Sequence, residues 1–249
     1  MPTDTLGMLL RQFCLTTMAA RCGEMIASAE AQNWGYRKLL VQLCEAEAAD
    51  RRERRRQRLL HDSKLPSGKT LGNLEEGKLP AKVRRQLPTL LEGGFVERAE
   101  NLLVFGLPGR GKTHFLCALG RELILRHGLK ILFTPTFKLV QQLLAAKKDL
   151  RLDALLKRLD SFEGIVLDDL GYVQQSREEM EVLFTFLAER YERRSVMISS
   201  NLVFSKWDQI FKDPMTTMAA VDRLVHHAVI LEFDGETHRA PAPKDKGGS

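Results

Sequence analysis

The stretch NLLVFGLPGRGKT, residues 101–113, decides the fold of this chain. Its first five residues are an apolar run that ends at Gly106, which predicts a buried parallel strand. The next eight fit the pattern GxxxxGK[ST], and residues 111–127 predict an amphipathic helix. In this strand–loop–helix context the glycines let backbone N–H groups converge on one point, and the helix N-terminus adds positive potential. A phosphate-binding P-loop is therefore expected.

The loop also assigns roles to its last residues. Lys112 is expected to reach the β- and γ-phosphates of a nucleotide, and the Thr113 hydroxyl to bind Mg²⁺. The expected nucleotide contacts are Gly106, Leu107, Pro108, Gly109, Arg110, Gly111, Lys112, Thr113 and His114. The alternative interpretation is a Gly-rich turn before a helix with no ligand.

Hydrolysis needs further polar groups at the ends of neighbouring strands. The apolar run 164–167 is followed by Asp168, expected to hold Mg²⁺, and Asp169, expected to orient or deprotonate the attacking water. The run 195–199 leads to Asn201, which could sense the γ-phosphate because polar groups at the carboxyl ends of parallel strands face the ligand crevice. An acidic turn after 164–167 and an ordinary turn asparagine are the alternatives.

Working outward, apolar strands alternate with helices along the chain. Strands are predicted at 101–105, 130–134, 164–167, 195–199 and 229–233. Helices are predicted at 111–127, 138–147, 151–159, 177–192 and within 205–227. Alternation of this kind indicates an α/β fold with a parallel five-stranded sheet flanked by helices. A shorter helix at 81–92 is expected to be interrupted near Pro88.

The N-terminal region is different in character. Residues 5–60 have helical periodicity and predict two or three helices, the last of which carries the densest basic cluster in the chain. That cluster consists of Arg51, Arg52, Arg54, Arg55, Arg56 and Arg58. The expected organisation is a helical domain over 1–62, a linker over 63–99, the nucleotide-binding domain over 100–239 and a disordered tail over 240–249.

Composition narrows the class of protein. The 249 residues include 38 Lys and Arg against 32 Asp and Glu, a net charge of +6, which permits an anionic partner. No long uncharged apolar run and no signal-like N-terminus occur, so we expect a cytoplasmic protein with no membrane partner. The four cysteines form no CxxC pair and are expected to be reduced thiols. His226 and His227 lack a third ligand at metal-binding spacing, which favours a structural role.

Residues 106–239 resemble the IstB family of insertion-sequence transposition helper ATPases, AAA+ proteins close to the DnaC helicase loader. The matching segments are GLPGRGKTH, IVLDDLGYV, REEMEVLFTFLAERYERRS, SSNLVFSKWDQIFKDP, AAVDRLVHHAVILEF and GETHR. The resemblance implies a Mg·ATP-dependent ATPase that forms a homo-oligomer with ATP sites between subunits. It also implies that the oligomer remodels double-stranded target DNA and recruits or stimulates the transposase of the same element.

The resemblance extends to individual residues. Lys112 and Thr113 correspond to the Walker A motif, Asp168 and Asp169 to Walker B, and Asn201 to sensor 1. Arg223 falls where the family has an arginine finger that acts on the neighbouring subunit, and Arg239 where a sensor 2-like arginine contacts nucleotide. Two departures stand out: relatives often have Glu in place of Asp169, and too little chain follows Arg239 for a full helical lid.

The DNA contacts are expected from the arginine cluster of residues 51–58, together with Lys147 and Lys148 in the 138–158 region. The simpler interpretation of both segments is a solvated helix face. Three other functions remain open at this point: a helicase loader, a nucleotide-gated interaction module with little hydrolysis, and a small-molecule kinase. The kinase is the least favoured, because no separate acceptor pocket is evident.

Overall fold

The computed structural model describes residues 3–171, 176–202 and 222–234. The chain divides into two compact units, residues 1–58 and 59–249, and each is described by itself. Of the sequence expectations, Arg239, the tail 240–249 and most of the helical region within 205–227 lie outside the described residues. Among the helices that are described, none is long and apolar enough to cross a membrane.

The first unit is helical, as the periodicity predicts. It contains α1 (Thr3–Gln12), α2 (Thr16–Ala31) and most of α3 (Tyr36–Asp62), and the unit boundary falls within the last turns of α3. Its buried apolar cluster is small and consists of Met18, Cys22 and Leu43. Polar contacts between Glu47 in α3 and the start of α2 add to this small apolar core.

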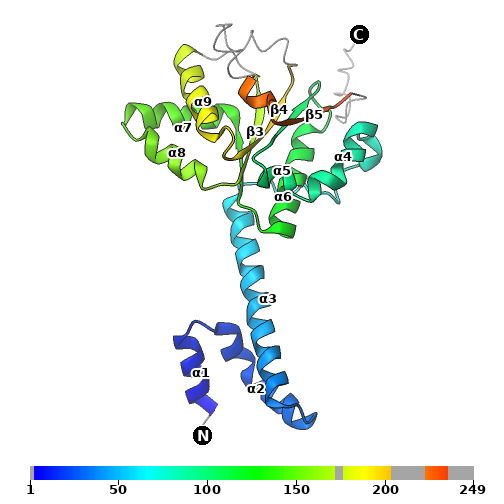
Figure 1. Ribbon diagram of the computed structural model, residues 1–249, viewed down its shortest axis with the longest axis vertical. Coiled ribbons are helices and arrows are strands. Elements are labelled where there is room, and N and C mark those ends of the chain that lie inside the picture. The colour runs from blue at the N-terminus through cyan, green and yellow to red at the C-terminus, as the bar shows by residue number, and fades with distance from the viewer. Residues whose placement is uncertain (1–2, 172–175, 203–221, 235–249) are drawn as a thin grey trace, which may run out of the picture. The chain divides into compact units, whose positions relative to one another are not determined.

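The second unit contains the parallel five-stranded sheet that the sequence predicts (Figure 1). The strands are β1 (Asn101–Phe105), β2 (Ile131–Pro135), β3 (Gly164–Leu170), β4 (Ser195–Ser200) and β5 (Ala228–Glu232). Their order in the sheet is β2-β3-β4-β1-β5, so β1 lies between β4 and β5. All four pairings are parallel, which brings the carboxyl ends of the strands to one edge.

Helices cover both faces of this sheet, as Figure 1 shows. The helices are α6 (Lys112–His127), α7 (Thr136–Lys148), α8 (Leu152–Asp160) and α9 (Arg177–Arg190). Because alternate residues of a strand point to opposite faces, Leu102 and Val104 pack with α6. Leu103 and Phe105 pack on the other face with α7, α8 and α9. The result is a three-layer α/β/α arrangement.

The segment 63–99, expected to be a linker, has secondary structure of its own. It contains η1 (Glu76–Lys78), α4 (Ala81–Leu91) and α5 (Gly94–Glu97), and its apolar side chains belong to the α6 side of the core. The interruption expected at Pro88 is wrong, since α4 continues through it. Pro88 lies on the exposed side of α4, where the backbone carbonyl that loses its hydrogen bond can be hydrated.

A buried arginine connects the N-terminal ends of two strands to the C-terminal end of a neighbouring helix. Arg190, at the end of α9, is 2 % exposed, and burial lowers the pKa of its guanidinium to about 9. Its two terminal nitrogens donate to backbone carbonyls rather than to a carboxylate. The acceptors are Leu159 O at 3.0 Å, Phe162 O at 3.0 Å, Glu163 O at 3.5 Å and Ser195 O at 3.0 Å. One side chain thus satisfies carbonyls at the end of α8 and at the starts of β3 and β4.

We predict that Arg190→Met lowers the free energy of unfolding by about 3 kcal/mol, because four backbone carbonyls each lose a hydrogen bond, although those of Leu159 and Glu163 keep a backbone N–H donor. The control is Arg193→Met, whose exposed side chain pairs with Asp160 at 2.7 Å and Glu189 at 3.4 Å. An exposed pair of this kind is worth at most about 1 kcal/mol. Urea denaturation of the full chain measures both variants. Equal losses would show that the buried carbonyl contacts add nothing.

Candidate functional site

The P-loop turns immediately after β1, and its first glycine is required by a close contact. Gly106 has φ +151°, and a Cβ at this position would lie 2.6 Å from the carbonyl oxygen of Phe233. Gly111, at φ +84°, is the N-cap of α6, so a left-handed residue starts the helix. A side chain would clash at Gly106 and would be strained at Gly111.

Phe233, just beyond β5, holds the loop from the neighbouring strand. Its backbone N–H donates to Phe105 O at 2.7 Å, and its carbonyl accepts from a terminal nitrogen of Arg110 at 3.2 Å. Its ring packs edge-on against Phe115 of α6, with the ring centroids 5.4 Å apart. The loop is therefore fixed to β5 on one side as well as to its own strand and helix.

The structure brings Lys112 and Asn201 together. Lys112 Nζ donates to Asn201 Oδ1 at 2.6 Å, and to the carbonyls of Gly106 at 2.6 Å and Leu107 at 3.0 Å. Although Lys112 is only 5 % exposed, its ammonium lies among polar oxygens. A cation held at this point, beside the backbone N–H groups of the loop, suits the phosphates of a nucleotide.

Thr113 and Asp168 also come together. Thr113 Oγ1 donates to Asp168 Oδ1 at 2.7 Å, and Asp168 is 9 % exposed. Thr136 Oγ1, at the start of α7, donates to the backbone carbonyl of Asp168 at 2.9 Å and fixes the strand end. A carboxylate and a hydroxyl side by side are hard oxygen ligands of the kind Mg²⁺ prefers, so these residues fit the expected metal.

A pocket of about 430 Å³ lies at the carboxyl edge of the sheet. Asp168 does not line it, but is hydrogen-bonded to Thr113, which does. The predicted residues that line it are Pro108, Gly109, Arg110, Gly111, Lys112, Thr113, His114, Asp169 and Asn201. Gly106 and Leu107 were expected to contact nucleotide but do not line it. Their carbonyls instead bind Lys112, and the Leu107 side chain is 58 % exposed.

Two further residues at the site were missed by the sequence analysis. Lys69 lines the pocket although it belongs to the expected linker, and the neighbouring Thr70 holds His114 through its carbonyl, 3.0 Å from Nε2. Ser199, completely buried in β4, donates to Asp168 Oδ1 at 2.6 Å. Nothing in the local sequence distinguishes these residues from ordinary loop and strand residues, because their role depends on long-range contacts.

Arg223 lies at the opposite end of the sheet from this pocket. It is exposed in a helical turn over 222–225, just ahead of β5, and the next residue, Leu224, accepts a hydrogen bond from the Asn101 side chain at 3.1 Å. Asn101 begins β1, whereas the P-loop follows its end about 15 Å away. Arg223 therefore does not contribute to the pocket of its own chain.

The histidine pair has a third polar neighbour that spacing did not reveal. His227 Nε2 lies 3.8 Å from a carboxylate oxygen of Glu192, and the possible ligand atoms of Glu192, His226 and His227 all lie within 4.8 Å of one another. His226 Nδ1 also lies 2.9 Å from the Tyr191 hydroxyl. All three side chains are exposed, and they form a polar cluster between the α9–β4 turn and the turn before β5.

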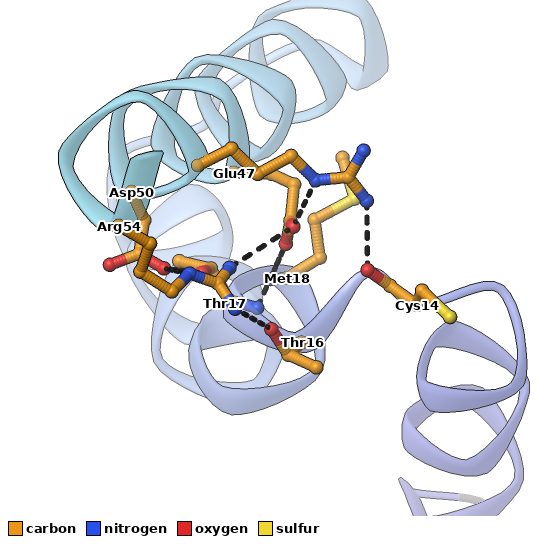
Figure 2. Close-up of polar contacts among 8 residues, drawn as sticks. Cys14, Thr16, Thr17, Met18, Glu47, Asp50 and Arg54 are labelled. Carbon is orange, nitrogen blue, oxygen red and sulfur yellow. Dashed lines mark hydrogen bonds and ion pairs between the residues drawn. The ribbon is translucent and has the colours of Figure 1, made fainter. Parts of the chain in front are cut away.

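In the first unit, a buried carboxylate organises part of the arginine cluster (Figure 2). Glu47, 4 % exposed, accepts from the backbone N–H groups of Thr17 at 2.8 Å and Met18 at 3.1 Å, and from Arg51 Nε at 2.8 Å. Burial acts to raise the pKa of Glu47, but these three donors outweigh it and leave the pKa lowered. Glu47 therefore stays ionised and satisfies the first N–H groups of α2.

Arg51 and Arg54, both expected to bind DNA, are exposed but also make hydrogen bonds within this unit (Figure 2). Besides its bond to Glu47, Arg51 donates to the Cys14 carbonyl at 2.8 Å. Arg54 donates to Thr16 Oγ1 at 3.1 Å and pairs with Asp50 at 2.8 Å. These contacts tie α3 to the α1–α2 corner, so both guanidinium groups have a structural role.

The rest of the cluster is different. Arg52, Arg55 and Arg58 are exposed, and the described residues give them no ion pair. Arg56 is half-buried and has only a loose contact with Glu53, at 3.9 Å. Of the two lysines expected to bind DNA, Lys147 pairs with Glu181 at 2.9 Å, while Lys148 is exposed with no ion pair among the described residues.

We predict that Gly106→Ala weakens nucleoside triphosphate binding about fivefold or more, because strain of about 1–3 kcal/mol must be relieved by moving the loop or Phe233. Gly128→Ala is the matched control. It also has positive φ, +67°, but no atom lies near the added Cβ, and it caps the far end of α6. Titration with a fluorescent ATP analogue measures both. Unchanged affinity in Gly106→Ala would contradict the steric argument.

Known proteins with similar sequences are ATP-binding proteins of insertion sequences. Among curated proteins, an insertion sequence ATP-binding protein of Sinorhizobium fredii is 39% identical over 235 residues, which cover 94% of this chain and 78% of the relative. An insertion sequence IS21 ATP-binding protein of Pseudomonas aeruginosa is 32% identical over 242 residues, covering 97% and 91% of the two chains.

Among solved structures, the DnaC helicase loader has a TM-score of 0.55 at 18% identity, over 61% of this chain and 89% of that one. AMPPCP-bound DnaA from Aquifex aeolicus has a TM-score of 0.57 at 20% identity, over 69% and 51%. Both show that the fold is that of AAA+ P-loop proteins. Residues 8–245 match the family model described as IstB-like ATP binding protein. The P-loop, the neighbouring acidic strand end and the match over nearly the whole chain together show that the chain belongs to this family.

Proposed function

We propose that this chain is an ATP-hydrolysing helper of transposition that assembles on duplex DNA as an oligomer. In this proposal the oligomer remodels target DNA and recruits or stimulates the transposase encoded by the same element. The observation that carries it is a pocket lined by Lys112 and Thr113, with Asp168 hydrogen-bonded to the Thr113 hydroxyl, in a chain of the IstB-like family. The insertion-sequence names of the relatives support the link to transposition.

The residues of the pocket have distinct roles in the proposed hydrolysis. Lys112 binds the β- and γ-phosphates, and Asn201, 2.6 Å from Lys112 Nζ, contacts the γ-phosphate. Thr113 and Asp168 hold Mg²⁺, which supplies charge neutralisation at the phosphates when bound. Asp169, exposed at the pocket wall, orients the attacking water or accepts its proton.

The position of Arg223 supports an oligomer. An exposed arginine at the far end of the sheet cannot stabilise charge at its own P-loop, but it can reach the pocket of a neighbouring copy. We propose this role for Arg223, and a nucleotide contact from the same chain for Arg239. Hydrolysis would then require assembly, because each site is completed by the next subunit.

A second candidate is a helicase loader, favoured by the similarity in fold to the DnaC helicase loader. It predicts preference for single-stranded DNA and association with a replicative helicase instead of a transposase. A nucleotide-gated module with little hydrolysis is a third candidate, since Asp169 has a shorter side chain than the Glu often found at this position. It predicts ATP-dependent assembly with turnover that Asp169→Asn leaves at the same background level.

For DNA binding we propose the arginines of α3 that make no ion pair with any residue the structure describes. Arg52 and Arg55 are exposed and lie three residues apart, on one side of the helix, with Arg56 and Arg58 close by. Such groups bind phosphates without reading base sequence. Lys148 is a further candidate in the second unit, whereas Lys147 would first have to leave Glu181.

The proposed hydrolysis can be tested with two variants of the site. With duplex DNA present, Lys112→Ala and Arg223→Ala should each lower ATP turnover at least about 100-fold. An equal mixture of the two variants should recover activity, because about one interface in four then joins an intact Lys112 to an intact Arg223. Phosphate release measures turnover, and sizing of each sample measures assembly. A mixture as inactive as its components would contradict action between subunits.

A further prediction distinguishes the arginines proposed to bind DNA from those that make contacts within the helical unit. Arg52→Gln with Arg55→Gln should weaken duplex binding and make the slope of log affinity against log salt shallower by about 2. Arg51→Gln with Arg54→Gln removes the same charge from the same helical turns but should chiefly lower the thermal stability of the helical unit. Fluorescence anisotropy at several salt concentrations and thermal melts measure these effects. Equal salt slopes for the two double variants would contradict the assignment.

A further inference from the structure

The edge of the sheet that carries Asp168 and Asp169 is irregular. β3 pairs with β4 in regular register up to Leu167 opposite Ile198, but Leu170 is then opposite Ser200. Three residue steps on β3 therefore match two on β4, which is the pattern of a β-bulge. Asp169 has φ +57°, a left-handed conformation that is strained for a residue with a side chain.

Ser199 holds this bulge from the neighbouring strand. Its hydroxyl accepts a hydrogen bond from the backbone N–H of Asp169 at 2.9 Å and donates to Asp168 Oδ1 at 2.6 Å. A serine hydroxyl has one proton to donate, and here it is directed to the carboxylate. Since Ser199 is completely buried, water does not replace either bond readily.

The two contacts act on different residues. The bond to Asp169 stabilises the backbone turn that aims the Asp169 side chain into the pocket. The bond to Asp168 orients a carboxylate whose same oxygen also accepts from Thr113. A single hydroxyl thus fixes the metal-side carboxylate and the water-side carboxylate relative to each other.

We infer that Ser199 is a positioning residue for hydrolysis, which sets the geometry of Asp168 and Asp169 without touching the nucleotide. This inference rests on the proposed ATPase activity. Two effects can therefore be separated. Nucleotide binding without metal depends on the P-loop alone. Ser199 affects how much Mg²⁺ strengthens that binding and how fast the bound nucleotide is hydrolysed. Groups that orient metal ligands in this way typically contribute about 10–100-fold to metal affinity or activity.

Ser200 provides a matched control on the same strand. It is also completely buried, and its hydroxyl lies 2.9 Å from the Leu170 carbonyl and 3.0 Å from the Leu202 carbonyl, both of which can accept its hydrogen bond. It contacts neither Asp168 nor Asp169 in the described contacts. If Ser199 had only a structural role, Ser199→Ala and Ser200→Ala should have similar effects.

We expect Ser199→Ala to lower kcat at least about tenfold and to raise the Mg²⁺ concentration for half-maximal turnover about fivefold or more, with KM for ATP within about threefold of wild type. Binding of a fluorescent ATP analogue gives a readout that does not depend on turnover. In EDTA the variant should bind as wild type does, and added Mg²⁺ should strengthen its binding less. Ser200→Ala should leave all these quantities within about threefold.

Ser199→Cys keeps the shape of the side chain with a slightly larger atom that is a weaker donor, so it should show the same pattern if the alanine variant fails to fold. The inference is overturned if wild-type turnover is lost in Lys112→Ala but retained in both Ser199 variants, or if Ser200→Ala reproduces their effects. If wild type itself shows no turnover that depends on Lys112, the proposed ATPase function fails, and the Mg²⁺-dependent binding of the Ser199 variants still tests the inference.

Discussion

The rest of the nucleotide-binding unit depends on the alignment of three neighbouring strands, β4, β1 and β5. The side chain and backbone of Asn101 keep these strands in register. This buried residue at the start of β1 accepts from the backbone N–H of Val196 in β4 at 2.9 Å and donates to the Leu224 carbonyl before β5. Its own N–H donates to the carbonyl of His227 at 2.7 Å. With the starts of the strands level, their ends are level too, and the P-loop meets Asn201 on one side and Phe233 on the other.

The proposed chemistry depends on the polar side chains at the carboxyl ends of the strands. Apolar side chains fill both faces of the sheet, so polar groups are concentrated where the strands stop. There, hydroxyls from three different elements, in Thr113, Thr136 and Ser199, converge on Asp168 or its backbone. Such a network holds a nearly buried carboxylate in one orientation, and preorganisation of this kind is what a phosphoryl-transfer site requires. The proposed activity thus depends on the same long-range contacts that stabilise the sheet edge.

The arginines of this chain have different roles, which depend on their tertiary surroundings. Arg190 is buried and serves carbonyls, Arg51 and Arg54 connect helices through acidic and carbonyl partners, and Arg52 is free of ion pairs among the described residues. All four belong to basic stretches that look alike in the sequence. Burial and the availability of a partner decide which of them can bind DNA phosphates, and both properties arise only when the helices pack.

The sequence by itself determined the three-layer class, the five parallel strands and the P-loop with its acidic strand end, because strand and helix periods and the GxxxxGKT pattern are local signals. It also predicted that Lys112, Thr113, Asp168 and Asn201 lie at one edge of the sheet, since they follow strands of one parallel sheet. Only the tertiary structure decided that α4 runs through Pro88, that Lys69 lines the pocket, that Ser199 holds the bulge and that Arg51 and Arg54 form hydrogen bonds within the helical unit. Each of these depends on contacts between residues far apart in the chain, where burial and hydrogen-bond partners outweigh local preference.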